Sequence, residues 1–148
     1  CPLDMNAFTG YAVLTSTWTM QYMNVESLLV HTHLDEDMPN TVVVESMYYD
    51  GYDIRITFKN DNRLEPLIEM PEAQVVGSTG EAFGTIYGNG KLMMTQPSDS
   101  GSYYSSCEMF LLQYVTLYVE EVGTVGTYAN IIEWISDDEA ERIMREGF

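Results

Sequence analysis

Basic side chains are scarce in this sequence. Six lysines and arginines stand against 23 aspartates and glutamates, so the 148 residues carry a formal net charge of −17, and no basic residue precedes Arg55. Such a surface repels both a phosphate backbone and the anionic headgroups of a membrane. We therefore expect no nucleic-acid partner and no direct adsorption to an anionic bilayer.

Long apolar runs and catalytic motifs are also missing. The longest apolar run, Met109 to Val119, contains Gln113 and Thr116 and is much shorter than the ~18–20 residues of a transmembrane helix. The sequence has no glycine-rich phosphate loop and no Cys-x-x-Cys, and two histidines leave little for general-base catalysis. These absences favour a non-enzymatic protein that needs no cofactor.

Only two cysteines are present, and they allow two interpretations. The chain has no initiator methionine and starts at Cys1, which suggests a processed product whose signal peptide has been removed. In the first interpretation, Cys1 is the lipidated first residue of an exported lipoprotein and Cys107 is a lone thiol. In the second, Cys1 and Cys107 form a disulfide that closes most of the chain.

The stretch from Thr41 to Asn60 has the clearest pattern and predicts a β-hairpin. Asp50-Gly51 lies between two β-branched and aromatic runs, as in a two-residue type I′ turn. In the second arm, apolar and polar side chains alternate, so one face is buried and the other is wet. A two-residue turn gives the pairs Tyr49/Tyr52, Met47/Ile54, Glu45/Ile56 and Val43/Phe58. This register places Glu45 on the apolar face, and a longer turn would change it.

Further strands are predicted on both sides of this hairpin. Tyr11–Tyr22 alternates like a long strand whose inner face includes Trp18 and Met20, and Asn89-Gly90 forms the turn of a second hairpin over 81–95. The remaining expected strands are 27–34, 63–76, 103–122 and 127–135, of which 63–76 is irregular because it contains two prolines.

These segments predict an all-β fold, an antiparallel meander barrel of about eight strands in the lipocalin or calycin style, with a two-sheet sandwich as the alternative. Residues 1–10 are predicted to form an N-terminal tether that is followed by a plug or a first strand, and residues 11–148 form a single barrel domain. A short C-terminal helix over 137–146 closes the chain, because Ser136 to Glu139 reads as a capping box and Gly147 as a stop.

Several features together carry a resemblance to a known family. They are Cys1, the segment Phe8-Thr9-Gly10-Tyr11 before a long strand, the two Asx-Gly turns, the segment Val119–Tyr128 and the capped terminal helix. With these features the chain resembles the small calycin-like β-barrel lipoproteins of Bacteroidetes, and Phe8–Tyr11 is similar to the Gly-x-Trp segment that opens lipocalins. The resemblance implies a lipid-anchored barrel at the cell surface or facing the periplasm.

Candidate metal ligands gather near the first histidine. His31, His33 and Asp35 alternate along one strand and therefore share a face, and two imidazoles with a carboxylate can hold Zn²⁺ or Fe²⁺. Asp35 and Asp37 are the better candidates for calcium among the acidic loops. The competing interpretation is that Leu28, Val30, Thr32 and Leu34 face inward, so both histidines face solvent.

Candidate ligand-binding residues come from the predicted barrel interior. Glu45, placed inward by the two-residue turn, has the environment in which a carboxyl pKa rises and the group acts as an acid or holds a polar ligand atom. Trp18, Trp134 and Tyr128 are candidates to line a cavity or stack on a sugar. The competing interpretation is core packing, which explains most aromatics at inward strand positions and is the favoured one.

The sequence leads us to expect an exported, lipid-anchored, non-enzymatic module at the outer membrane or cell surface that binds a partner protein in an envelope complex. The first alternative is a secreted or anchored carrier that holds a small apolar or glycan ligand inside the barrel. The second is an enzyme that uses Glu45 or the His31/His33 pair. A filled interior favours the first function, and an open cavity favours the carrier.

Overall fold

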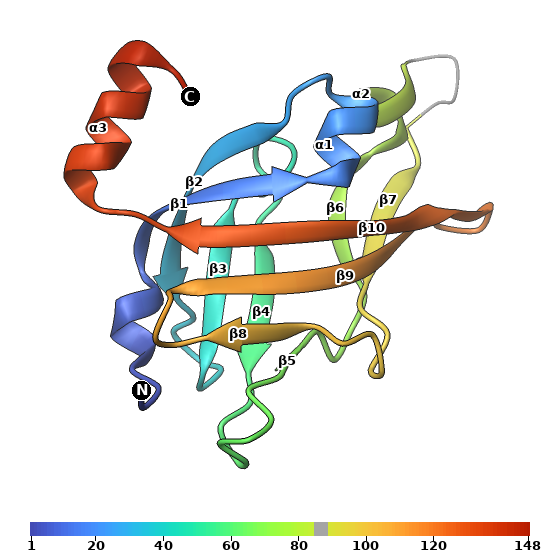
Figure 1. Ribbon diagram of the computed structural model, residues 1–148. Coiled ribbons are helices and arrows are strands. Elements are labelled where there is room, and N and C mark those ends of the chain that lie inside the picture. The colour runs from blue at the N-terminus through green and yellow to red at the C-terminus, as the bar shows by residue number, and fades with distance from the viewer. Residues whose placement is uncertain (85–88) are drawn as a thin grey trace.

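The computed structural model describes residues 1–84 and 89–148 and consists of one curled antiparallel sheet with short helices at its margins (Figure 1). The predicted fold class is confirmed, with ten strands among the described residues where about eight were expected. In chain order the strands are β1 (Gly10–Ser16), β2 (Ser27–Leu34), β3 (Thr41–Glu45), β4 (Ile54–Phe58), β5 (Ile68–Glu69), β6 (Gln74–Ser78), β7 (Lys91–Thr95), β8 (Tyr103–Ser105), β9 (Phe110–Val119) and β10 (Gly123–Trp134).

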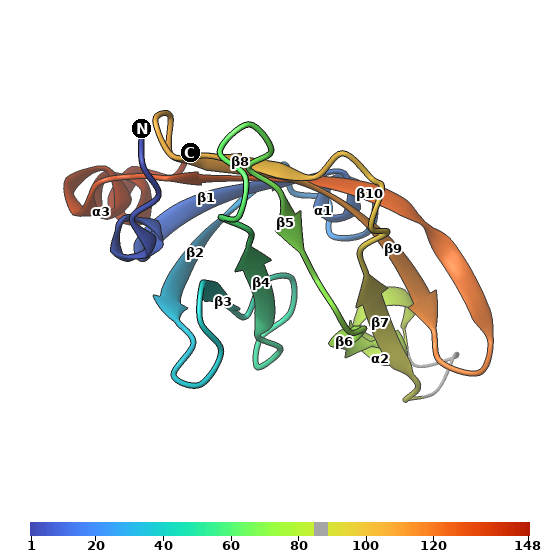
Figure 2. The same ribbon diagram turned by 90° about the horizontal axis from the view of Figure 1, so that it is seen from below.

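The sheet follows the order β5-β4-β3-β2-β1-β10-β9-β7-β6 and curls into a half-barrel, seen from below in Figure 2. The long strand β9 pairs with β10 along one edge and with two strands along the other. Its first part pairs with β8, and its last part, from Thr116 to Val119, pairs with β7. The strands thereby form one continuous sheet that curves around a single core.

The sheet ends at β5 and β6, and because β5 is short, a seam remains between β4 and β6, where no ladder joins the described strands. An isolated bridge between Leu67 and Tyr103 spans one end of the seam. Farther along, the side-chain amide of Gln74 makes the two hydrogen bonds that the backbone of a neighbouring strand would make. Its Oε1 accepts from the Arg55 amide at 2.7 Å, and its Nε2 donates to the Arg55 carbonyl at 2.8 Å. These contacts occupy polar groups that an open edge would leave exposed.

A turn forms at Asp50-Gly51, where the Tyr52 amide donates to the Tyr49 carbonyl at 3.2 Å, but the predicted register of the two flanking strands is wrong. Val43 lies opposite Arg55 where the two-residue turn placed it opposite Phe58, so the register moves by three residues. The strands separate at Ser46, which has a φ of 47°, and the Ser46 amide donates to Asp53 Oδ1 at 2.9 Å. Because the shift is odd, Glu45 lies on the outer face of the sheet and not on the inner one.

The predicted long strand over 11–22 is also wrong in its second half. Strand β1 ends at Ser16, whose hydroxyl accepts from the Trp18 amide at 3.1 Å and caps the helix α1 (Thr17–Tyr22). The helix keeps Trp18 buried but turns Met20 outward, and Met20 is 44% exposed. The prediction assumed that side chains alternate between two faces, as in a strand, whereas residues 17–22 follow the period of a helix.

The N-terminal segment, predicted as a tether, contributes to the core. It forms the 3₁₀ helix η1 (Met5–Phe8), which is capped by Asp4. Phe8 is fully buried, with ring centroids 4.8 Å from Phe58 and 4.9 Å from Trp134. The segment thus plugs one end of the half-barrel.

Two further helices flank the sheet. Helix α2 (Thr79–Phe83), with a capping box between Ser78 and Glu81, occupies part of the second predicted hairpin, and residues 85–88 of that hairpin lie outside the described residues. Helix α3 (Asp137–Glu146) confirms the C-terminal prediction: the Ser136 hydroxyl accepts from the Glu139 amide at 3.1 Å. Helix α3 contacts β1 and buries Ala140 and Ile143.

A chain of hydrogen-bonded polar side chains crosses the core. In order, its members are Ser16, Tyr48, Asn130, Gln113 and Gln96, all buried, and it ends where Gln96 Nε2 donates to the Ile68 carbonyl at 2.7 Å. Asn130 is the central member, because its Oδ1 accepts from the Tyr48 hydroxyl and its Nδ2 donates to Gln113 Oε1 at 3.2 Å. Burial raises the pKa of Tyr48, so its hydroxyl remains a hydrogen-bond donor at any physiological pH. In the described part of the chain, every buried side-chain nitrogen and oxygen has a partner.

Replacing Asn130 with alanine tests whether this polar chain holds the core together. Asn130→Ala leaves the Tyr48 hydroxyl and the Gln113 carbonyl oxygen without their partners in a dry interior, and we expect a loss of about 2–4 kcal/mol of unfolding free energy. Urea denaturation measures it. The control Thr127→Ala changes an exposed position of the same strand and is expected to cost less than about 1 kcal/mol. Equal stability of the two variants would contradict the role given to the chain.

Candidate functional site

The aromatic side chains proposed to line a ligand cavity lie in the packed core. Trp18 is fully buried, stacks on Tyr22 at 4.0 Å and meets the edge of Tyr128 at 4.9 Å. Trp134 is 9% exposed, and its Nε1 donates to Thr32 Oγ1 at 3.0 Å. The three candidates therefore cross-link strands and loops and present no open face toward a ligand.

Two cavities lie at the margins of the sheet. One of about 460 Å³ is lined by Cys1, Arg63 and Tyr104 among others, and one of about 330 Å³ lies between β5 and the loop that precedes β8. Neither is lined by Trp18 or Trp134. Polar groups dominate both walls, so they lack the apolar character of a lipocalin-type pocket.

Glu45 lies on the outer face, in a cluster with the two histidines of the chain. Its Oε2 is 2.5 Å from His31 Nδ1 and 3.1 Å from His33 Nδ1, and the imidazoles come from adjacent outward positions of β2. Hydrogen bonding by His31, and secondarily by His33, lowers the pKa of Glu45 below its usual range. This is the opposite of the raised pKa expected for an inward carboxyl, and the reason is the shifted hairpin register.

The predicted metal ligands do not come together. Asp35 accepts from the Met38 amide at 2.8 Å and pairs with Arg55 Nε at 2.8 Å, and these contacts lower the pKa of Asp35. Asp37 is exposed in the following loop, where its amide donates to Asp35 at 3.2 Å. Within residues 1–84 and 89–148, no group of three or more His, Cys, Asp or Glu side chains has the arrangement to hold a metal ion. Asp35 organises its own loop and the neighbouring strand.

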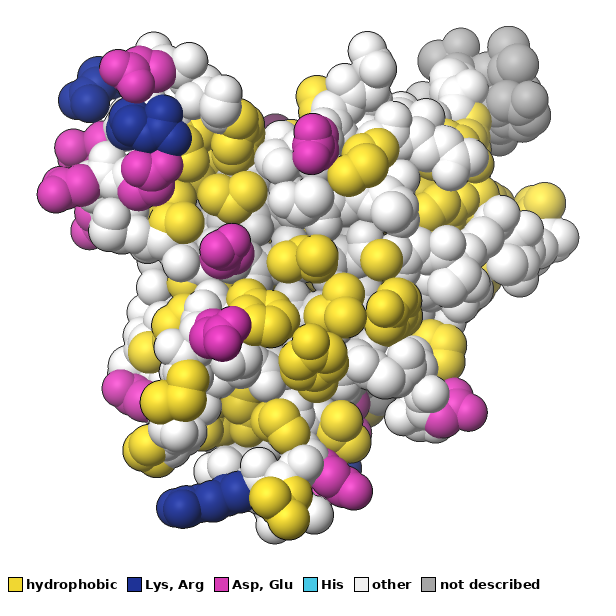
Figure 3. Space-filling view, viewed as in Figure 1, with side chains coloured by type: hydrophobic (Ala, Val, Ile, Leu, Met, Phe, Trp, Pro, Cys, Tyr) yellow, Lys and Arg dark blue, Asp and Glu magenta, His cyan; other side chains and the backbone are white. Residues whose placement is uncertain are grey.

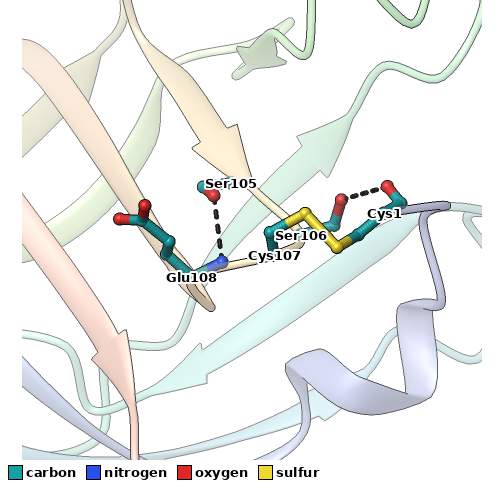
Figure 4. The surroundings of a disulfide bond; sticks show 5 residues. All are labelled: Cys1, Ser105, Ser106, Cys107 and Glu108. Atoms are coloured by element: carbon teal, nitrogen blue, oxygen red, sulfur yellow. Dashed lines mark hydrogen bonds between the residues drawn. A yellow bond between two sulfur atoms is a disulfide. The ribbon is translucent and has the colours of Figure 1, made fainter.

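Cys1 and Cys107 are joined by a disulfide, which corresponds to the second interpretation of the cysteines (Figure 4). The bond links residues 106 positions apart and ties the start of the chain to the turn between β8 and β9. The Ser106 hydroxyl donates to the Cys1 carbonyl at 2.7 Å beside it. The Cys1 sulfur cannot form this disulfide and carry a lipid thioether at the same time, so the two interpretations exclude each other.

The sequence interpretation missed an apolar surface on the outside of β8, β9 and β10. Direct cross-strand pairing places Ile131 beside Leu112 and Leu112 beside Tyr103, and the bridge to Leu67 extends the row across the seam. Phe110 and Tyr114 flank Leu112 on the same face of β9. We call these six residues, Leu67, Tyr103, Phe110, Leu112, Tyr114 and Ile131, the outer apolar face.

The outer apolar face is open to solvent. Ile131 is 43% exposed, and Leu67, Tyr103 and Tyr114 are each 37% exposed. Figure 3 shows apolar side chains gathered over these strands, while the basic side chains of this view lie away from them. One signal in the sequence indicates this surface. In residues 109–119, the odd-numbered and the even-numbered positions are both mostly apolar, as in a strand that is covered on both faces.

The comparisons give the family but no function. The chain belongs to the family described as "Domain of unknown function (DUF4984)", whose model matches residues 1–146. No curated protein matches the sequence. In the described part of the chain, no helix has the length and apolarity to cross a membrane.

Glu45→Gln tests the cluster through pH. A folded-state pKa below the usual 4.5 means that Glu45 adds stability above that pH, and that this stability is lost as the pH falls through the lowered folded-state value. Because the Glu45 side chain is 39% exposed, we expect the free energy of unfolding of the wild type to exceed that of the variant by only about 0.2–1 kcal/mol at pH 6. The difference should shrink as the pH falls below 4.5 and vanish once Glu45 is protonated in the folded state as well.

Urea denaturation across this pH range measures the difference, and Glu120→Gln removes an equal charge from an exposed turn as the control. A difference for Glu45→Gln that persists unchanged to the lowest pH would show that charge on Glu45 has no part in it.

Cys107→Ser tests the disulfide. Removing a covalent link that closes a long loop enlarges the entropy of the unfolded chain, so we expect a loss of about 2–5 kcal/mol and a lower Tm. A thiol reductant should destabilise the wild type to the same extent and leave the variant unchanged. Ser106→Ala, which removes only the adjacent hydrogen bond, is the control. If the Tm of the wild type were the same with and without the reductant, the lipidated form of Cys1 would be favoured.

Proposed function

We propose that this protein is an exported, non-enzymatic binding module that acts through its exterior, as an accessory subunit that joins a partner protein in an envelope or surface complex. The observation that carries the proposal is the filled interior. The core is occupied by packed aromatics and by the polar chain through Asn130, which leaves the outside of the sheet as the surface for recognition.

Export is supported by the disulfide. A bond such as Cys1–Cys107 persists in oxidising compartments and is rare where cellular reductants act. The resemblance to calycin-like lipoproteins supports the same destination by a different route, a lipid on Cys1. One sulfur cannot carry both modifications, so we favour the disulfide-linked form, held at the envelope by its partner.

The two alternatives have less support. A carrier needs a cavity that encloses most of its ligand, whereas Trp18, Trp134 and Tyr128 pack against protein. An enzyme that uses Glu45 or the histidines needs a cleft that excludes water, whereas these side chains are 39–51% exposed on an outer face. The packed aromatics therefore do not favour a ligand carrier, and the exposed Glu45 and histidines do not favour an enzyme.

Intact and native mass spectrometry of the protein purified gently from its source tests the proposal. We expect the unmodified chain, lighter by the two hydrogens lost on disulfide formation and heavier by the same amount after reduction, together with co-purifying protein subunits and no retained small molecule. The Cys107→Ser chain, which shows no mass change on reduction, calibrates the measurement.

Other results would redirect the proposal. An acylated Cys1 with protein subunits would retain the binding module but replace the disulfide with a lipid anchor. A small molecule retained in equal amount to the chain, without subunits, would overturn the module in favour of a carrier.

A further inference from the structure

We infer that the outer apolar face is the docking surface of the module, and that its occupant is a folded protein whose contact area is an apolar strip bordered by lysine or arginine. The inference rests on the proposed function, because it assigns the surface and the partner chemistry of that binding activity.

The register makes the outer apolar face continuous. Ile131, Leu112 and Tyr103 are direct neighbours on β10, β9 and β8, so their side chains form one row perpendicular to the strands. Directly paired side chains on one face lie ~4.5–5.5 Å apart at Cβ, close enough to exclude water between them. The row continues through Leu67, and the Tyr103 ring meets Phe110 edge-on at 5.9 Å.

The inner and outer faces of the sheet are reversed in polarity at this point. Asn130 is paired with Gln113, and both amides face the core, while the adjacent pair Ile131 and Leu112 faces solvent. An antiparallel sheet with one solvated face ordinarily has the opposite pattern. Apolar side chains at the outward positions of neighbouring strands therefore indicate a second buried face, completed by another molecule.

No described element of the chain covers this surface. Helix α3 packs at the start of β1, and the loop between β2 and β3 lies on the side of the half-barrel away from β8, β9 and β10 (Figure 2). The exposed side chains are tyrosine, leucine and isoleucine on paired strands, which lose little rotamer entropy on binding. Tyrosine is also enriched among the residues that dominate protein interfaces.

Charge defines the partner. Glu133 is exposed and is paired with Phe110 at the border of the outer apolar face, and Glu108 is exposed in the turn that precedes β9. The sequences of β8, β9 and β10 contain no lysine or arginine. A second copy would bring a net charge of −17 against −17, and nucleic acid or an anionic membrane would be repelled in the same way. A protein with a neutral apolar strip and cationic side chains at its border matches both the row and its acidic margin.

Site-specific photo-crosslinking locates the contact. A benzophenone amino acid replaces Tyr114 on the outer apolar face or, as the control, Met38 in the loop between β2 and β3, and each full-length chain is irradiated in a gentle extract of its source. We expect a defined protein adduct from position 114 and none from position 38. The captured protein is then identified and purified, because the adduct by itself does not establish specific binding.

Binding of the purified pair decides the inference. Ile131→Lys and Met38→Lys add the same charge at side chains of equal exposure, 43% each. We expect Ile131→Lys to raise Kd at least ~30-fold and Met38→Lys to leave it within about threefold. Unchanged Tm values verify folding. Glu133→Lys should weaken binding and reduce its dependence on salt, as expected for a cationic border on the partner.

Each contrary outcome is distinct. A partner that binds Ile131→Lys as well as the wild type would overturn the docking surface but leave the proposed function standing. A concentration-dependent dimer abolished by Ile131→Lys would replace the partner with a second copy, and saturable binding of a glycan at Tyr103 and Tyr114 would replace it with carbohydrate. No protein adduct from either position would count against the proposed function itself.

Discussion

The paired amides of Asn130 and Gln113 are the contact on which the rest of the structure depends. Buried amides cost free energy unless each polar atom is bonded, so their presence requires Tyr48 and Ser16 on one side and Gln96 on the other. Those partners come from β1, the loop after β3 and the end of β7, so the requirement fixes how distant parts of the chain meet. It also fills the centre of the half-barrel, which leaves recognition to the exterior.

The sequence predicts the elements of this fold better than their registers. The N-cap at Ser136 is predicted correctly, because the bond from the Glu139 amide to the Ser136 hydroxyl lies within one turn, whereas the Glu139 carboxylate, predicted to complete a capping box, pairs with Arg142. The central hairpin exists as predicted, yet its register depends on the left-handed backbone of Ser46 and the carboxyl of Asp53, seven residues away. A turn does form at Asp50-Gly51, where the Tyr52 amide donates to the Tyr49 carbonyl at 3.2 Å, but the bond from the Ser46 amide to Asp53 sets a different register for the strands beyond it. That one difference moves Glu45 from a buried site to the exposed histidine cluster.

The candidate site was harder to predict for a related reason. An apolar residue in a strand is assigned to the core by default, and alternation cannot say which of two apolar faces lies inside. In β9, Leu111 and Leu112 are both apolar, and the set that faces inward is the one that contains Leu111 and the polar Gln113, which bonds to Asn130. A polar residue thus marks the inner face here, contrary to the usual rule. The cysteines show the same limit, because their spacing permits a bond that only the folded chain brings together.

Rigidity connects this architecture to the proposed binding. The outer apolar face lies on strands whose inner sides are held by the polar chain, while the disulfide and Phe8 secure one end of the half-barrel. A surface held in this way is already in its bound shape, so little conformational entropy is lost when a partner docks. The acidic surroundings then attract a cationic partner and repel a second copy, while the apolar row supplies the contact energy. Buried polar groups inside and apolar groups outside are therefore two parts of one arrangement: the first keeps the sheet rigid, and the second uses that rigid sheet for recognition.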